Sequence, residues 1–216
     1  MHPFLLSIWV AAWAGAIALI IGTIIAWGLV QSRSPRKWMV EALVITPLIL
    51  PPTLLGYYLL VLLGQRGLGP VIEQWFGFRF VFSVQGAILA ATITALPLVT
   101  QAVQASLGDV GHQVKDAARV DGAAEWQVFL FVSLPLAWRG ILAGAILGFL
   151  RAMGDFGATL MIAGNIPGRT QTIAMAIYDA TQANDMTRAN EYALLLSFIA
   201  FGMLFLAMKL RQKVDS

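Results

Sequence analysis

The longest uncharged stretch of the chain, from Phe4 to Val30, restricts the fold more than any other feature. An apolar helix of about 20 residues crosses the hydrocarbon core of a bilayer, so this stretch predicts a transmembrane helix. Further apolar runs cover Trp38–Leu63, Val84–Leu107, Leu136–Ala163 and Tyr192–Met208. Only 12% of the 216 residues are charged, against about 25% in soluble domains. We therefore expect an all-α integral membrane protein with about five transmembrane helices in one domain, residues 4–210.

Two of the runs contain helix-breaking residues. Pro51 and Pro52 lie inside the second run, and proline removes a backbone donor and clashes with the preceding turn, so we expect a kink there. As one helix, the fourth run would be about 42 Å long, which exceeds a hydrocarbon core of about 30 Å. We therefore expect it to break within Gly154–Gly157. Its glycines at four-residue spacing, Gly140, Gly144 and Gly148, predict a smooth face for close helix contact.

Two segments outside the runs are also predicted to be helical. Val71–Phe76, in a glycine-rich loop, is expected to form a short helix at the membrane interface. Thr170–Asn190 is moderately polar, with apolar residues at helical spacing. It predicts an amphipathic helix outside the bilayer.

Several polar side chains lie within the runs, and such side chains usually face the bundle interior or a wet path. The third run contains Thr92, Thr94, Thr100, Gln101 and Gln104. Arg151 and Asp155 are four residues apart and can pair on one helix face. The candidates for a pathway or gate are Thr92, Thr94, Gln101, Arg151, Asp155 and Thr159. Interhelical hydrogen bonding explains the third-run groups equally well, and pairing with Asp155 or a place at the outer interface explains Arg151 more simply.

The distribution of cations predicts the orientation of the chain. Five spans put the termini on opposite sides. One side would carry nine cations: Arg33, Arg36, Lys37, Lys115, Arg119, Arg139, Lys209, Arg211 and Lys213. The other would carry four: Arg66, Arg79, Arg169 and Arg188. Because cytoplasmic loops are enriched in Lys and Arg, we expect the N-terminus outside and the C-terminus in the cytoplasm.

The polar segment from Asp116 to Pro135 would then lie in the cytoplasm. We expect Asp116 to begin a helix, where the macrodipole favours an acidic group. Ala117 and Ala118 would let a partner approach the backbone closely, and Gly122 would permit a bend. Pro135 suits the first turn of the next helix. These features indicate a docking element, and a merely solvated loop is the alternative.

The segment resembles a motif of the transmembrane subunits of ATP-binding-cassette (ABC) importers. That motif reads Glu-Ala-Ala, three residues, Gly, nine residues, Ile, one residue, Leu-Pro. The corresponding residues here are Asp116, Ala117, Ala118, Gly122, Val132, Leu134 and Pro135. The spacing matches throughout, with Asp in place of Glu and Val in place of Ile. Two further stretches, Thr46–Tyr58 and Gly154–Asn165, look like the molybdate permease branch of the same family.

The resemblance implies the type I ABC importer permease fold and a permease subunit in a bacterial inner membrane. Two copies of the chain would form the pathway for an oxyanion, with molybdate favoured over sulfate, thiosulfate and tungstate. A loop at residues 109–132 would be the coupling element for a cytoplasmic ATPase dimer. A periplasmic binding protein would deliver the oxyanion on the side of the N-terminus.

Other classes of protein fit the sequence less well. A P-loop needs Gly-Lys followed by Ser or Thr, and no lysine here follows a glycine, so the chain is not the ATPase and ATP hydrolysis would reside in a partner. The only histidines, His2 and His112, are too far apart in this scheme to build a metal site, and no cofactor or nucleic-acid partner is expected. An ion-coupled secondary transporter usually has an internal repeat and midplane carboxylates; no repeat is found.

Overall fold

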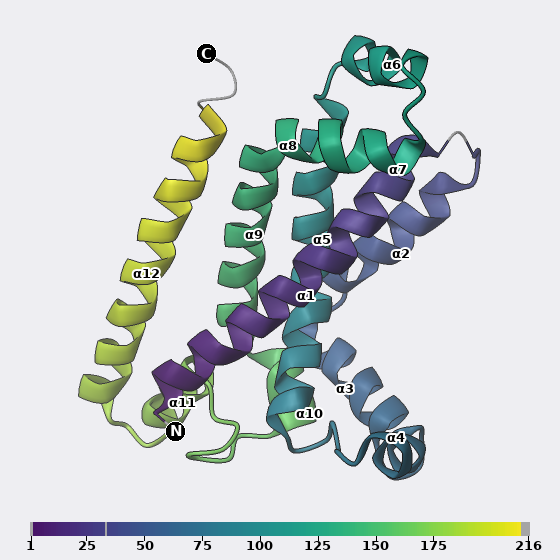
Figure 1. The fold of residues 1–216 in the computed structure, drawn as a ribbon. Coiled ribbons are helices and arrows are strands. Elements are labelled where there is room, and N and C mark those ends of the chain that lie inside the picture. Colours follow the sequence, from purple (N-terminus) through teal and green to yellow (C-terminus); the bar gives the residue numbers. More distant parts are fainter. Residues whose placement is uncertain (1, 33, 213–216) are drawn as a thin grey trace.

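A computed structural model describes residues 2–32 and 34–212 as a bundle of helices (Figure 1). The helices are α1 Pro3–Gln31, α2 Lys37–Ile49, α3 Pro52–Leu63, α4 Gly69–Phe76, α5 Val84–Gly108, α6 His112–Val120, α7 Glu125–Gln127, a π-helix Val128–Ser133, α8 Leu134–Leu136, α9 Trp138–Met153, α10 Gly157–Ala163, α11 Ile173–Gln182 and α12 Met186–Gln212. In this part of the chain, α1, α5 and α12 are each long and apolar enough to cross a membrane, and two bent helix pairs raise the number of spans to as many as five. The expected all-α membrane architecture is confirmed.

The core is formed by α1, α5 and α9, which pack along much of their lengths. Small residues make this packing close, because they let helix backbones approach one another. They include Ala11, Ala14 and Ala18 of α1 and Ala90, Ala91 and Ala95 of α5, all fully buried. A Cβ on Gly148 would lie 2.4 Å from Cγ2 of Val99, and one on Gly144 would lie 3.1 Å from Cβ of Ala102. The predicted glycine face of α9 is therefore in contact with α5.

The second run is broken more sharply than the expected kink. The chain bends by 108° between α2 and α3. The residue before a proline is pushed out of the helical region, and two consecutive prolines act on two residues. Leu50 and Pro51 both have extended backbones, with ψ of 141° and 131°. Two successive non-helical residues redirect the chain, whereas a single internal proline such as Pro47 leaves α2 continuous.

The fourth run breaks where expected, since α9 ends at Met153 and α10 begins at Gly157. The helices that follow the two breaks, α3 and α10, pack against each other. A Cβ on Gly157 would lie 3.1 Å from Cβ of Pro52, and one on Gly56 would lie 2.6 Å from the carbonyl oxygen of Ala158. The backbones on either side of the two breaks are thus in direct contact.

The segment expected as one amphipathic helix over Thr170–Asn190 is divided. Its first part is α11, whose backbone N–H at Ile173 donates to Ser7 Oγ at 2.7 Å. Asn184 then adopts a φ of 58°, and the Asp185 carboxylate accepts from the N–H of Arg188 at 3.1 Å. This cap starts α12 at Met186, six residues before the expected start at Tyr192. The predicted short helix after Gly69 is present as α4.

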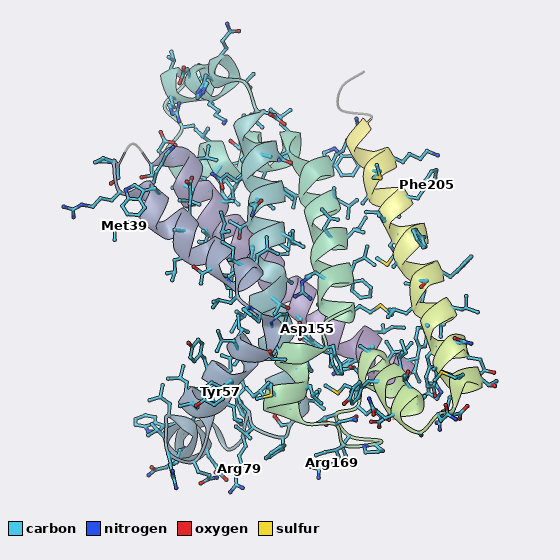
Figure 2. The ribbon with its side chains drawn as sticks, turned by 180° about the vertical axis from the view of Figure 1, so that it is seen from behind. Met39, Tyr57, Arg79, Asp155, Arg169 and Phe205 are labelled. Carbon is cyan, nitrogen blue, oxygen red and sulfur yellow. The ribbon has the colours of Figure 1, made fainter. Side chains whose placement is uncertain are left out.

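The cations lie at two opposite ends of the bundle (Figure 1). The end that carries α6, called the α6 end below, also carries the starts of α2 and α9 and the end of α12. By the helix bounds it holds Arg36, Lys37, Lys115, Arg119, Arg139 and Lys209. The end that carries α4, called the α4 end, holds Arg66, Arg79, Arg169 and Arg188; Figure 2 labels Arg79 and Arg169 there. Arg33, Lys213 and the side chain of Arg211 lie outside the described part. The two predicted groups of cations are thus separate in space.

The α3–α10 contact makes a prediction about Gly56. We expect Gly56→Ala to lower the free energy of unfolding by about 1–3 kcal/mol, because the added methyl group meets the main chain of α10 rather than a movable side chain. Thermal unfolding of the purified protein in detergent measures this. Gly202→Ala in α12 is the control, since nothing lies within 4 Å of its Cβ position. Equal melting temperatures for the two variants would contradict the close contact.

Candidate functional site

The α6 end carries the polar segment, and α6 starts earlier than expected. It begins at His112, directly after Gly111, so Asp116 lies in the middle of the helix rather than at its start. The expected interaction of Asp116 with the helix N-terminus is wrong. Its carboxylate instead accepts from Arg119 Nη1 at 2.6 Å, the i, i+3 spacing of a surface ion pair.

The bend expected at Gly122 is present. Gly122 has a φ of +88°, a conformation that glycine adopts without the strain a Cβ imposes. A π-helix, Val128–Ser133, then leads into the three-residue α8, which contains Leu134 and Pro135. Pro135 is thus in the first turn of a short helix, and a 77° bend separates this piece from α9.

The outer surface of α6 combines small and apolar groups. Asp116 and Ala117 are exposed and Ala118 is half-buried. Val120 at the end of the helix is 87% exposed, and Trp126 is also exposed. The polar segment therefore presents small and apolar groups to its surroundings as well as charged ones. Sequence reasoning missed Val120, although an apolar residue between two charged ones was the available signal.

Charged and polar groups at the exposed surface connect the segment to the end of α1. Arg119 Nε donates to Glu125 Oε1 at 2.7 Å, and Arg119 Nη2 donates to Glu125 Oε2 at 3.1 Å. Gln31, the last residue of α1, donates to the same carboxylate. These hydrogen bonds to Arg119 and Gln31 hold the pKa of Glu125 below its usual value. The i, i+6 spacing of Arg119 and Glu125 across a turn left no sequence signal for this pair.

Lys115 makes a buried contact in the same segment. It is 7% exposed, and its Nζ donates to the carbonyl oxygen of Leu107 at 2.9 Å. Burial lowers the pKa of Lys115, and the nearby charge of Arg119 lowers it further. Lys115 and Arg119 line a cavity of about 20 Å³, together with Trp27 and Phe129. The sequence predicted only that Lys115 is on the cation-rich side.

A second polar cluster lies at the break between α9 and α10 (Figure 2). Asp155, 2% exposed, accepts from the N–H of Thr159 at 3.0 Å and from its hydroxyl at 2.6 Å. Arg151 Nη1 donates to the same carboxylate at 3.3 Å. The pairing of Arg151 with Asp155 is confirmed. Asp155 thus satisfies the backbone N–H of Thr159 in the first turn of α10.

The polar residues of α5 are not part of this cluster. The hydroxyls of Thr92 and Thr94 are buried and donate to carbonyls of their own helix, at 2.7 and 3.1 Å. Gln101 is exposed. Among the described residues, no hydrogen bond joins these three to Asp155. Gln104 donates to Glu41 of α2 at 3.2 Å, which is an interhelical hydrogen bond of the kind considered for this run.

Residues 2–32 and 34–212 also contain no group of three acidic or histidine side chains able to hold a metal.

The cluster makes a prediction about stability. We expect Asp155→Ala to lower the free energy of unfolding by about 2–4 kcal/mol, because it leaves Arg151 without its charged partner and the N–H of Thr159 unsatisfied. Thermal unfolding in detergent measures the change. Asp109→Ala is the control, since Asp109 is exposed at the end of α5. A loss no larger than that of the control would mean that the Asp155 contacts contribute little.

Comparison with known proteins places these features in a family. The sequence profile of the family described as "binding-protein-dependent transport system inner membrane component" matches residues 6–215. The molybdenum transport system permease protein ModB of Escherichia coli (strain K12) is 42% identical over 179 residues, covering 82% of this chain and 78% of that protein. ModB of Haemophilus influenzae is 40% identical over 200 residues, covering 90% and 87%.

The fold has solved counterparts. The structure described as "inward facing conformations of the MetNI methionine ABC transporter" superposes with a TM-score of 0.76 and covers 98% of this chain and 94% of that one. Its sequence is 18% identical, so this likeness concerns the fold alone.

Proposed function

The chain belongs to the family of binding-protein-dependent transport system inner membrane components, and from that membership we propose that it is the permease subunit of an ATP-driven oxyanion importer. Two copies would form the pathway. The chain would contribute no ATP hydrolysis itself. A cytoplasmic ATPase dimer would supply the energy, and a periplasmic binding protein would deliver the anion.

The observation that carries the coupling role is the exposed face of α6. Asp116, Ala117 and Ala118, followed by the bend at Gly122, form a projecting helix whose end exposes Val120. A groove on the ATPase would receive this face, and residues 109–132 would be the coupling loop. Val132, Leu134 and Pro135 would fix the return of the chain to the membrane. The α6 end would be cytoplasmic, which agrees with its excess of cations, and the N-terminus would be periplasmic.

Molybdate is the proposed substrate, because the two relatives above, at 40–42% identity over most of their length, are molybdenum permeases by name. Sulfate, thiosulfate and tungstate are the alternatives, since tetrahedral dianions present similar oxygen groups. No observation favours an ion-coupled transporter.

The contacts divide the pathway candidates into two groups. Arg151, Asp155 and Thr159 satisfy one another, so we propose that they maintain the α9–α10 break and act on the pathway through its shape. Thr92 and Thr94 satisfy their hydroxyls within α5. Gln101 is exposed, and a polar amide in a span avoids lipid. We propose that it faces the pathway or the second copy.

Reconstitution tests the substrate. With the permease, its ATPase and the binding protein in liposomes, we expect molybdate to stimulate ATP hydrolysis and to be taken up. Sulfate at the same concentration should do neither, because the binding protein selects the anion before delivery. Equal stimulation by sulfate would assign the chain to the sulfate branch. ATP hydrolysis insensitive to every oxyanion would contradict the proposed substrate class.

Gly122→Asp tests the docking role. Its Cβ would meet nothing within 4 Å, so the substitution adds only backbone strain of about 1–2 kcal/mol and a charge on the proposed contact surface. We expect normal membrane insertion and loss of ATPase co-purification. Gly108→Asp adds the same charge at the end of α5, outside the proposed coupling loop, where a Cβ also meets nothing within 4 Å, and should retain the ATPase. An intact, active complex with Gly122→Asp would refute the docking role.

A further inference from the structure

The burial of Lys115 is unexpected for a lysine on a short polar helix. Lysine is rarely buried without a partner, because its ammonium loses hydration. Val114 and Asp116, its neighbours in α6, are exposed. Lys115 therefore lies on the side of α6 that faces the bundle, whereas Asp116, Ala117 and Val120 of the surface proposed to meet the ATPase are exposed.

The partner of Lys115 is the end of a membrane helix. Leu107 lies in the last turn of α5, where carbonyl groups have no partner within the helix. The partial negative charge at a helix C-terminus favours a cation there. The hydrogen bond of 2.9 Å from Lys115 Nζ gives the Leu107 carbonyl a partner and places a cation at the end of α5. Lys115 thus caps α5 from another helix and fixes the distance between α6 and the end of α5.

A second attachment joins the same segment to α1. Arg119 holds Glu125, and Glu125 accepts from Gln31 at the end of α1. Beside it, the rings of Trp27 and Phe129 are stacked with centroids 4.7 Å apart. The ends of α1 and α5 are therefore both bonded to the polar segment.

The two attached helices are also packed together. A Cβ on Gly22 of α1 would lie 3.0 Å from Oγ1 of Thr100 and 3.1 Å from Cγ1 of Val99 in α5. Such close contact leaves little room for one helix to slide on the other. A force applied to α6 through its attachments would therefore act on α1 and α5 as one body.

We propose that Lys115 is a positioning residue for energy coupling, which transmits displacement of α6 to the α1–α5 pair through its bond to Leu107. The proposal rests on the proposed function. It deepens that function by naming the contact through which docking would reach the spans. Without this bond α6 would still present its outer face and stay attached to α1 through Arg119 and Glu125, but among the described residues its only direct connection to α5 would be the loop at 109–111.

Lys115→Met tests this role, because methionine keeps an unbranched apolar side chain and lacks the donor. The full complex with ATPase and binding protein is reconstituted in liposomes with molybdate as the probe. Three quantities are measured: ATPase bound per permease, ATP hydrolysed, and molybdate taken up per ATP. We expect binding to be unchanged and uptake per ATP to fall about fivefold, the effect of losing one such hydrogen bond.

Two comparison variants complete the test. Lys115→Arg keeps a cationic donor and should recover most of the lost uptake per ATP. Lys37→Met removes an exposed lysine at the same end and should change nothing. Unchanged uptake per ATP in Lys115→Met would overturn the proposal, and so would loss of ATPase binding in step with uptake, which would mark a purely structural role. If the wild-type chain bound no ATPase, the proposed function would fail first, and this proposal with it.

Discussion

The hydrocarbon core of a bilayer offers no water, so backbone N–H and C=O groups within a span need partners inside the protein. Residues at the α2–α3 and α9–α10 breaks provide such partners or have no N–H group to satisfy. At the α9–α10 break, the Asp155 carboxylate receives the N–H and the hydroxyl of Thr159. At the α2–α3 break, Pro51 and Pro52 have no N–H to satisfy, and the Pro51 carbonyl accepts from Leu54 at 2.9 Å. The rest of the architecture depends on these two interruptions being tolerated.

The two breaks constrain each other because α3 and α10 are in backbone contact. Gly56 and Gly157 leave no space for a side chain between them and the opposite helix. A change of angle at Pro51 would therefore displace α10. The core of α1, α5 and α9 is packed through alanine and glycine, whereas α12 contacts mainly α9 and α11. The molecule thus combines a tightly packed centre with a paired set of bent segments at its α4 end.

Much of this arrangement could be predicted from the sequence, and the exceptions have physical causes. Apolar runs define spans because the bilayer demands a minimum length. The angle at Pro51 could not be predicted, since prolines only permit a turn whose size is set by packing against α10. Asp116 was misplaced because α6 starts after Gly111 without a side-chain cap. The burial of Lys115 could not be predicted from the sequence. Its partner is a main-chain carbonyl, which every residue has, so no residue type marks the contact.

The π-helix Val128–Ser133 affects how the chain would tolerate the loss of a residue in this segment. Its wider turn, in which the N–H of Leu134 bonds to the carbonyl of Phe129, accommodates one residue more than an α-helical turn would. Removing one residue there would let the turn become α-helical and keep the hydrogen-bonded path. Because the wide turn absorbs the extra residue, the residues after it would keep their faces, whereas a deletion from a regular α-helix rotates all later residues by about 100° about the axis. A one-residue deletion within Val128–Ser133 should therefore disturb α9 less than a deletion elsewhere among the nine residues between Gly122 and Val132.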